Sequence, residues 1–374
     1  MREIILKPEL VKFETFRDFA AEYQLNQNDL ILTTKYLYDT FVKECVGEIP
    51  YILQDSFGSG EPTGEMVQAI FDAAEYDSYD RVVAIGGGTV LDIGKLLTIR
   101  RTGSVNDLFF HRAELIREKK LIAIPTTSGT GSEVTSTSVA IVKDEEGNTT
   151  KMGLLSEDLI ADVACLIPEF LYELPMRPFA EAMIDALIHA TESYLSPTRA
   201  TMTTELFSLG AIRILLHGLK LYQQGVDIRK AYASELLTAS CYAGIAFLSA
   251  GCGIVHGVSY PMSGAYFVTH GAANYVFFPE TLRLYAEVAP EGKIKEIQKL
   301  ISEEFGCETN EALETLRLAE QDLLPIKKMH EYGVKEEDIE SFTASVLTNQ
   351  QRLVKNAYIE MTKERIIDLY RAVW

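Results

Sequence analysis

The stretch RVVAIGGGTVLDIGK (Arg81–Lys95) determines the fold class expected for the first half of the chain. Its apolar start is typical of a buried strand, and the glycines that follow open a pattern with helical spacing. Glycine lets the backbone approach an anion closely, and the first turn of a helix offers unpaired N–H groups and a favourable dipole. The stretch therefore predicts a strand, a phosphate-binding turn and a helix.

Two standard nucleotide-binding signatures do not match this turn. Leu91 stands where the Gly-x-Gly-x-x-Gly fingerprint has its third glycine, and Leu96 follows Lys95 where a P-loop has serine or threonine. A tight structural turn remains the alternative interpretation. Asp92 and Lys95, one turn into the helix, are candidates to cap it, to pair with each other or to contact a ligand.

A second turn, PTTSGTGSEVT (Pro125–Thr135), also follows an apolar strand pattern directly. Its hydroxyl groups and glycines can donate many hydrogen bonds to a phosphate-rich ligand without any positive charge. A Ser/Thr/Gly linker has a similar composition, but the apolar runs on both sides argue against that interpretation. Two such turns at consecutive strand ends favour one extended nucleotide as the ligand.

The rest of the first half alternates strand and helix patterns, which indicates βαβ units and a parallel sheet. Helices are predicted over Pro62–Glu75 and Val90–Ile99, and a hairpin over Ser138–Asp144 and the TTKMGLL segment that follows EEGN. The predicted strands of the parallel sheet are Leu30–Thr34, Pro50–Gln54, Arg81–Gly88 and Leu121–Pro125.

The pattern changes after LPMRPF (Leu174–Phe179), where long helical periodicities begin and strand patterns stop. Helices are predicted over Thr201–Tyr222, Ile228–Phe247 and Glu337–Leu353. We therefore expect an α/β domain over residues 1–180 and an all-helical domain over residues 181–374.

Four potential metal ligands lie in the helical half. Asp185 and His189 are four residues apart in a predicted helix, which places both on one face. His256 and His270 follow in an aromatic-rich segment without charged residues, and each precedes a glycine. One carboxylate and three imidazoles suit a divalent first-row metal. The alternative is that each histidine is an ordinary core or surface residue.

Composition limits the classes of function. The chain has 374 residues, of which 47% are hydrophobic and 24% charged, as in ordinary globular proteins. Its net charge of −19 argues against nucleic acid or an anionic membrane as a partner. The segment Ala239–Val258 has no charged residues but contains a histidine and several glycines, so we expect a buried core helix rather than a membrane span.

The five cysteines are scattered and form no Cys-x-x-Cys pair, which is typical of a reducing compartment. The first residues, MREIILKPEL, lack the apolar region of a signal peptide. We therefore expect a cytoplasmic protein.

Five motifs in this order resemble the iron-dependent (group III) alcohol dehydrogenases. The resemblance implies a Rossmann-like N-terminal dinucleotide-binding domain followed by an all-α metal-binding domain, the dehydroquinate synthase-like architecture. It also implies an NAD(P) cofactor, one Fe²⁺ or Zn²⁺ ion, and a homo-oligomer, as a dimer or larger. The motifs are GGGTVLDIGK, PTTSGTGSEVT, DALIHATESYLS, AFLSAGCGIVHGVSYPMSG and THGAANYVFFP.

Matched residue by residue, the resemblance implies that Asp185, His189, His256 and His270 are the metal ligands and act in catalysis through the ion. It places Lys151 near the ribose of the cofactor. The remaining residues implied to contact the cofactor, several of them at the pyrophosphate, are Gly87, Gly88, Thr89, Asp92, Thr126, Thr127, Ser128, Gly129 and Thr130.

Three positions depart from the family pattern. Tyr260 stands where many members have a histidine that helps to relay the substrate proton, so it is either a substitute proton relay or a structural aromatic residue. Thr34 replaces an aspartate that repels the 2′-phosphate of NADP, which leaves NAD and NADP both open. The segment KNAYIEMT (Lys355–Thr362) replaces a common NPR-type motif.

The HGVSYP, HGAANY and NQQRLVKNAYIE segments look most like the 4-hydroxybutyrate dehydrogenase branch of the family. This resemblance implies hydride transfer between NAD(H) and 4-hydroxybutyrate or succinate semialdehyde, with the ion as a Lewis acid. Arg352, Lys355 and Lys151 are candidates to bind the substrate carboxylate. For each of them, a solvated surface position is the alternative.

Other functions remain open at this stage. A general primary-alcohol or diol dehydrogenase, of the butanol or 1,3-propanediol type, would share the same metal and cofactor chemistry. A dehydroquinate synthase-type lyase needs several basic groups for an acidic, phosphorylated substrate. Residues 231–278 contain no lysine or arginine, which disfavours that lyase. A non-catalytic binding protein would not need both glycine-rich turns and a complete ligand set.

Overall fold

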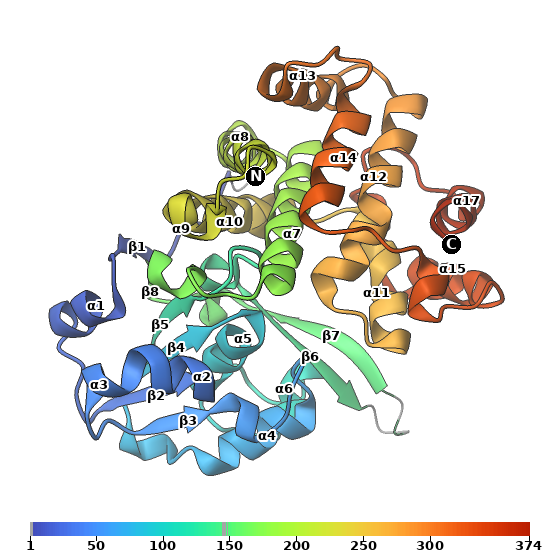
Figure 1. Ribbon diagram of the computed structural model, residues 1–374. Helices are drawn as coiled ribbons and strands as arrows, with labels where there is room; N and C mark the ends of the chain where they lie inside the picture. The colour runs from blue at the N-terminus through green and yellow to red at the C-terminus, as the bar shows by residue number, and fades with distance from the viewer. Residues whose placement is uncertain (1–2, 144–146, 148) are drawn as a thin grey trace. The chain divides into compact units, whose positions relative to one another are not determined.

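The computed structural model describes residues 3–143, 147 and 149–374, which form two compact units (Figure 1). The α/β unit spans Leu6–Glu173, and the helical unit spans Leu174–Trp374. The division thus precedes residue 180, where the sequence pattern places the domain boundary. Residues 3–5 also belong to the helical unit, where the Ile5 N–H donates to Ser249 Oγ at 3.2 Å.

A six-stranded, entirely parallel sheet forms the centre of the α/β unit, with strand order β1-β8-β5-β4-β2-β3. The four predicted strands of this sheet are present, and β1 and β8 are additional strands on one side of it. The strands are β1 (Glu9–Lys12), β2 (Asp29–Thr33), β3 (Tyr51–Leu53), β4 (Arg81–Gly86), β5 (Lys120–Pro125) and β8 (Val163–Leu166).

Both faces of this sheet are covered. Alternate residues of the central strands face opposite sides, so Leu30 and Val82 join one buried cluster while Ile31 and Val83 join another. The first cluster includes α4 (Gly64–Ala73), α5 (Gly88–Leu97) and α6 (Val105–Phe109). The second includes α1 (Phe16–Glu22), α2 (Lys35–Leu37), the π-helical turn η1 (Tyr38–Val42) and α3 (Lys43–Val46).

The predicted hairpin is an antiparallel pair, β6 (Thr137–Lys143) and β7 (Thr149–Leu155). Ala140, Val142 and Leu154 of this pair join the first cluster. Most of the predicted EEGN turn lies outside the described residues. The α/β fold class with a parallel sheet is therefore confirmed, with the hairpin as an inserted feature.

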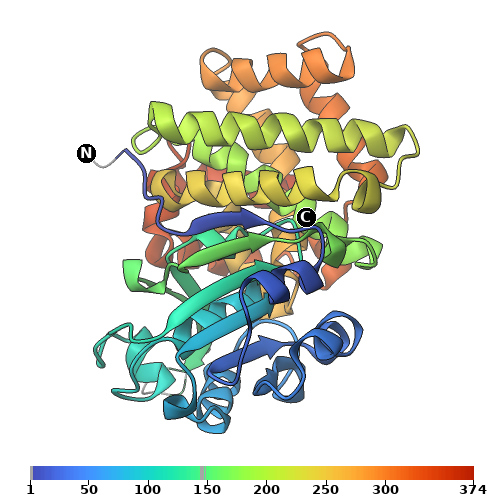
Figure 2. The same cartoon turned by 90° about the vertical axis from the view of Figure 1, so that its left-hand side faces the viewer.

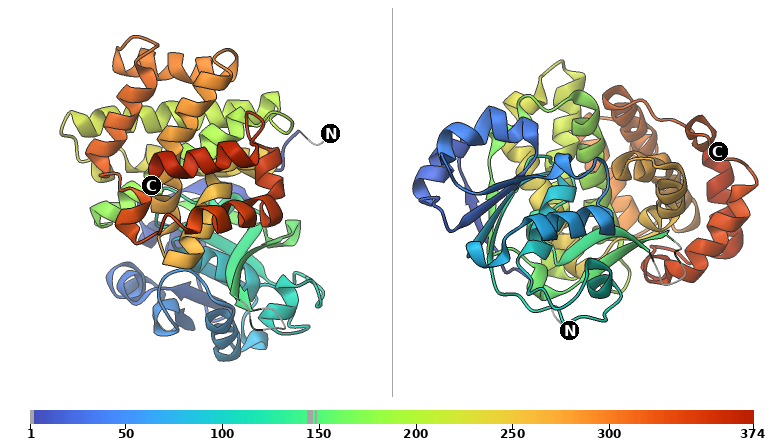
Figure 3. Two further views of the ribbon diagram at one scale, coloured as in Figure 1. Left: turned by 90° about the vertical axis from the view of Figure 1, so that its right-hand side faces the viewer. Right: turned by 90° about the horizontal axis from the view of Figure 1, so that it is seen from below.

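The described residues of the helical unit contain no strand, as the sequence predicts. Helix α7 packs against α8, α10 and α12, and α8 runs alongside α10 (Figure 2). At the C-terminal end, α15 lies beside α17 (Figure 3). The longer helices are α7 (Met176–Leu195), α8 (Met202–Gln223), α10 (Ala233–Ala250), α11 (Ile254–Tyr266), α12 (His270–Val288), α13 (Lys293–Phe305), α14 (Ala312–Leu323), α15 (Asp338–Asn349) and α17 (Lys363–Val373).

Two predicted helices are each divided in the structure. The pattern over Ile228–Phe247 forms α9 (Ile228–Ala231) and α10, separated at Tyr232, where φ is −137°. The pattern over Glu337–Leu353 forms α15 and α16 (Gln351–Lys355), separated at Gln350. Of the described helices, α10 alone has the length and composition to cross a membrane, but 61% of it is buried within the protein.

Candidate metal and cofactor sites

The structure brings the four predicted metal ligands together in the helical unit. Asp185 and His189 lie one turn apart on α7, His256 lies in the first turn of α11, and His270 begins α12. One ligand atom from each side chain lies within 4.8 Å of those of the other three. Asp185, His189 and His256 are buried, and His270 is half-buried.

The donor atoms converge on one small volume. Nε2 of His256 is 3.0 Å from Nε2 of His189. Asp185 Oδ2 is 3.7 Å from Nδ1 of His189, and Asp185 Oδ1 is 3.7 Å from Nε2 of His270. This arrangement of one carboxylate and three imidazoles matches the ligands that divalent zinc or iron takes in proteins.

Asn274 lies among these donor atoms. Its side-chain Nδ2 is 2.8 Å from Asp185 Oδ1, 3.1 Å from His256 Nε2 and 3.2 Å from His270 Nε2. Ser259 Oγ donates to its Oδ1 at 2.5 Å. An amide NH₂ has two hydrogens for these three acceptors, so it leaves electron-pair donors unsatisfied. The residues present therefore fit a cation.

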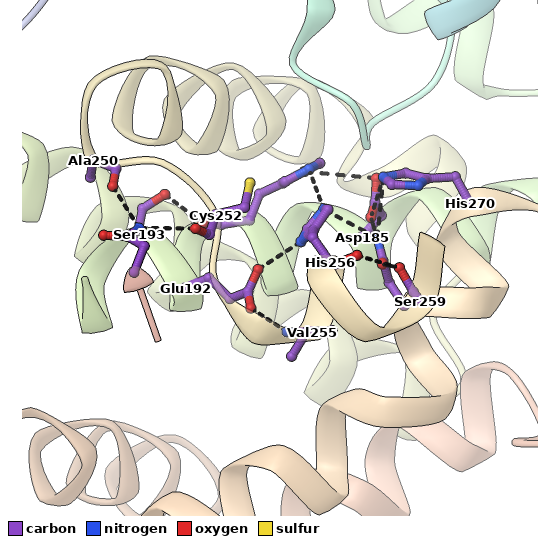
Figure 4. Close-up of polar contacts among 12 residues, drawn as sticks. Asp185, Glu192, Ser193, Ala250, Cys252, Val255, His256, Ser259 and His270 are labelled. Atoms are coloured by element: carbon purple, nitrogen blue, oxygen red, sulfur yellow. Dashed lines mark hydrogen bonds and ion pairs between the residues drawn. The ribbon is translucent and has the colours of Figure 1, made fainter. Parts of the chain in front are cut away.

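Glu192 holds the His256 imidazole from its other side (Figure 4). Glu192 Oε2 is 2.6 Å from Nδ1 of His256, and Glu192 Oε1 accepts from the Val255 N–H at 2.7 Å. A proton on Nδ1 leaves Nε2 of His256 with a free electron pair that faces His189. Such carboxylate–histidine contacts set the tautomer and orientation of metal-binding imidazoles.

The electrostatics of the site favour a bound positive charge. Burial raises the pKa of Asp185, but the three neighbouring imidazoles lower it more, so the net pKa falls below the usual value. Burial lowers the pKa of His256, while Cys252 and the Glu192 carboxylate raise it well above the usual value. Without an ion, therefore, a proton on His256 compensates the anionic carboxylates.

Aromatic rings surround the same site. Phe247 stacks on His189 with ring centroids 4.4 Å apart. The Tyr260 ring centroid lies 6.5 Å from that of His256 and 6.2 Å from that of His270. Burial raises the pKa of Tyr260, so the phenol keeps its proton at neutral pH and can donate it in a hydrogen bond.

In the α/β unit, the two glycine-rich turns lie against each other. A Cβ on Gly87 would be 3.6 Å from Thr127 Cγ2, and one on Gly88 would be 3.0 Å from Thr130 Cγ2. Gly87 caps α5 without a side-chain hydrogen bond, so the N-terminal N–H groups of this helix can meet an anion. Ser128 Oγ is buried without a hydrogen-bond partner among the described residues. These features fit a phosphate-bearing cofactor.

Asp92 and Lys95 have internal partners. Asp92 accepts from Ser132 Oγ at 2.6 Å and from the Val139 N–H at 2.9 Å. The fully buried Lys95 ammonium donates to Asp92, to Ser132 Oγ at 2.7 Å and to the Thr137 carbonyl at 2.6 Å. The two residues brace the second turn and β6 against α5. A cofactor contact by Asp92 stays a prediction.

The other expected cofactor residues lie in the α/β unit. Thr34 precedes α2 and makes no side-chain capping bond. Thr89 Oγ1 donates to the Gly60 carbonyl at 3.1 Å, and Lys151 Nζ pairs with Glu61 at 2.6 Å. Thr126 and Gly129 lie in the second turn, between β5 and β6. Lys151 thus has a carboxylate partner, whereas Lys355 is an exposed residue of the helical unit.

Three residues at the candidate metal site were not predicted from the sequence: Glu192, Asn274 and Cys252. Glu192 lies seven residues after Asp185, so helical spacing places both on the same side of α7. Asn274 lies four residues after His270, the spacing that also relates Asp185 to His189. These spacings were available in the sequence. Cys252 is near Glu192 and His256 in space, with ligand atoms of the three within 4.8 Å of one another.

Comparison with known proteins agrees with this architecture. The profile for iron-containing alcohol dehydrogenases matches residues 11–168, and that for the C-terminal part of the same family matches residues 179–374. The chain is 40% identical to 4-hydroxybutyrate dehydrogenase of Clostridium kluyveri, over 100% of both sequences. It is 31% identical to long-chain-alcohol dehydrogenase 1 of Geobacillus thermodenitrificans, over 83% of this chain and 78% of that protein.

Solved structures share the fold. A 1,3-propanediol oxidoreductase superposes with a TM-score of 0.84 at 24% identity, over 100% of both chains. Sulfoacetaldehyde reductase from Bifidobacterium kashiwanohense, solved with NAD⁺, gives 0.82 at 19% identity, over 100% of this chain and 98% of that one. The family implies an NAD(H)-dependent oxidoreductase that uses a divalent metal and acts on small alcohols or aldehydes. This chain belongs to the iron-containing alcohol dehydrogenase family.

Proposed function

We propose that this enzyme interconverts 4-hydroxybutyrate and succinate semialdehyde with NAD(H), in the cytoplasm. The observation that carries the proposal is the 40% identity to the C. kluyveri 4-hydroxybutyrate dehydrogenase, which extends over the full length of both chains. The absence of disulfides among its five cysteines supports a reducing compartment.

We infer that Asp185, His189, His256 and His270 hold the divalent ion, with Fe²⁺ as the ion in the cell and Zn²⁺ able to use the same ligands. A divalent ion supplies a Lewis acid for the substrate oxygen, and the nicotinamide supplies the hydride donor or acceptor. Glu192 orients His256, and the ionised Asp185 provides negative charge. The protonated Tyr260 phenol lies beside two of the ligands and is the proposed proton donor for aldehyde reduction.

We infer further that the two glycine-rich turns hold the cofactor pyrophosphate. Gly87 and Gly88 leave the N-terminus of α5 open to an anion, and the buried hydroxyl of Ser128 has a hydrogen bond to donate. Asp92 and Lys95 act on the cofactor through the turn they brace.

The proposal is tested by anaerobic NADH oxidation with Fe²⁺ added, comparing succinate semialdehyde with butyraldehyde. The two aldehydes have the same number of carbons, and only the first carries a carboxylate. A kcat/KM at least about tenfold higher for succinate semialdehyde is expected, since a charge-assisted contact contributes about 1.5–3 kcal/mol. Equal or reversed preference would indicate a general primary-alcohol or diol dehydrogenase.

A further inference from the structure

Four arginines of the helical unit form no ion pair among the described residues, and two of them, Arg199 and Arg352, influence each other electrostatically. The other two are Arg365 and Arg371. Among the described residues, no ion pair involves Arg199 or Arg352, and both are exposed. In contrast, carboxylates pair with other arginines of the same unit, namely Arg177, Arg213, Arg229, Arg283 and Arg317. In a chain with a net charge of −19, two adjacent guanidinium groups without an acid require an explanation.

Arg199 lies at the turn between α10 and α11, and the short helix that carries Arg352 is fixed to the same turn at its C-terminal end. Arg199 Nη1 is 2.9 Å from the position that a Cβ on Gly251 would occupy, so the guanidinium lies directly against this turn. Helix α16, which carries Arg352, ends at Asn356, and Asn356 Nδ2 donates to the carbonyls of Ala250 and Cys252 at 2.9 Å. Asn356 Oδ1 also accepts from Ser196 Oγ at 2.7 Å. The amide thus fixes the end of α16 and the Arg199 segment to one turn.

The charges of Arg199 and Arg352 influence each other, and the charge of Arg352 also influences Tyr260 beside the proposed metal ligands. Partial burial and the charge of Arg352 lower the pKa of Arg199. Burial raises the pKa of Tyr260, and the charges of His256 and Arg352 oppose that rise. The field of Arg352 therefore reaches the phenol that lies beside His256 and His270.

The turn between α10 and α11 lies between the two arginines and the candidate metal centre. Cys252 follows Gly251, and its sulfur lies with ligand atoms of Glu192 and His256 within 4.8 Å. A 4-hydroxybutyrate molecule spans about 5 Å from its hydroxyl oxygen to its carboxylate carbon, by standard bond lengths. When its oxygen is at the metal centre, its carboxylate must therefore be bound within a few side chains of the ligands.

We propose that Arg199 and Arg352 form the site that binds the substrate carboxylate, and so select ω-hydroxycarboxylates and their semialdehydes over neutral alcohols and aldehydes. This inference rests on the proposed function. Guanidinium is the side-chain group best suited to a carboxylate, because its fork of donors matches the two oxygens.

The test compares Arg199→Gln and Arg352→Gln with Arg371→Gln, which removes the same charge at an exposed position on α17 of the same unit. In each protein, kcat/KM is measured for succinate semialdehyde and butyraldehyde, with KM for NADH. Each arginine variant is expected to lose about 10- to 100-fold with succinate semialdehyde and less than about threefold with butyraldehyde. Arg371→Gln should change neither, and Arg352→Lys should restore part of the loss.

Binding provides a readout independent of turnover. Titration of 4-hydroxybutyrate into the enzyme–NADH complex, followed by nicotinamide fluorescence, should show the same loss of affinity in both arginine variants. Suppose that the wild-type enzyme prefers succinate semialdehyde. If both arginine variants keep that preference, this inference is overturned and the proposed function stays intact. Equal losses with both aldehydes, or a raised KM for NADH, would also overturn it. A wild-type enzyme without preference would instead contradict the proposed function.

Discussion

The Glu192 carboxylate lies 2.6 Å from Nδ1 of His256, on the opposite side of the imidazole from the other proposed metal ligands. Both side chains are buried, so the contact is formed away from solvent screening. It links α7, which supplies two of the ligands, to α11, which supplies the third. One carboxylate therefore controls both the tautomer of His256 and the spacing of two helices.

Replacing Glu192 with glutamine should weaken metal binding about 10- to 100-fold, because the amide no longer enforces a proton on Nδ1 of His256. The measurement is chelator competition for Co²⁺ or Zn²⁺ in the purified protein. Glu235→Gln, an exposed position on α10, is the matched control. Unchanged affinity in Glu192→Gln would show that the remaining ligands position His256 without help.

Metal affinity should fall steeply as the pH decreases. In the metal-free protein, burial lowers the pKa of His256 but Cys252 and Glu192 raise it well above the usual value, so the ion must displace a proton. The apparent dissociation constant is expected to rise about tenfold per pH unit below that raised pKa. In Glu192→Gln the dependence should begin at a lower pH. An affinity independent of pH between 6 and 8 (about the physiological range) would contradict this coupling.

The raised pKa of His256 also makes the stability of the metal-free protein depend on pH. Metal affinity should rise with pH, whereas the stability of the metal-free protein should fall. A raised histidine pKa contributes stability that is fully present below the unfolded value near 6.5 and is lost as the pH rises through the higher folded value. The urea midpoint of the metal-free protein should therefore be highest below about pH 6.5 and should fall as the pH is raised above that value. Bound metal should remove this loss, because it takes the place of the proton.

Glu133 predicts a second pH effect, in the α/β unit. Its side chain is 1% exposed, neither oxygen has a hydrogen-bond partner among the described residues, and burial raises its pKa to about 7. The folded protein is therefore destabilised as the pH rises from about 4.5 to about 7, by about 3 kcal/mol at about 1.4 kcal/mol per pH unit. Above about pH 7 Glu133 is ionised in the folded protein, so this loss of stability does not increase further.

Glu133→Gln should remove this penalty. The variant is expected to unfold at a higher urea concentration than the wild type at pH 8 and at a similar concentration at pH 5 (about the two sides of the transition). Glu75→Gln, at an exposed position in the same unit, should change neither midpoint. A destabilised Glu133→Gln protein at pH 8 would mean that attraction to the Lys95 ammonium, which opposes the rise in the Glu133 pKa, outweighs the cost of burial.

The sequence predicted those elements whose residues are buried in a regular pattern. Strands β2, β4 and β5 are apolar along most of their length because helices cover both faces of the sheet. Strand β1 (ELVK) lies at the sheet edge and is largely exposed, so its sequence has no apolar run to mark it. The helix breaks at Tyr232 and Gln350 have neither glycine nor proline, which leaves tertiary packing as their cause.

The candidate metal centre was predictable because its ligands are chemically distinctive and rare: the chain contains six histidines. For the proposed carboxylate-binding site, Arg352 was a candidate from the sequence, but Arg199 was not, because it is far from Arg352 in the sequence and looks like any surface arginine. Their proximity depends on Asn356, whose hydrogen bonds to the Ala250 and Cys252 carbonyls exist only in the folded chain. Long-range polar contacts of this kind leave no periodic pattern.

Cofactor choice provides the last prediction, at the N-terminus of α2. Thr34 follows β2, the neighbouring Lys35 ammonium is paired with Asp39 at 2.6 Å, and Asp55 accepts from the Lys35 N–H at 3.0 Å. If the ribose lies here, as the family resemblance implies, Thr34→Asp should add repulsion against the 2′-phosphate of NADPH. We expect kcat/KM to fall at least about tenfold with NADPH and less than about twofold with NADH. The control is Thr34→Asn, because asparagine has the shape of aspartate without its charge. Asp55→Asn removes a neighbouring negative charge and should therefore shift cofactor preference toward NADPH. Equal losses with both cofactors in Thr34→Asp would place the 2′-hydroxyl elsewhere.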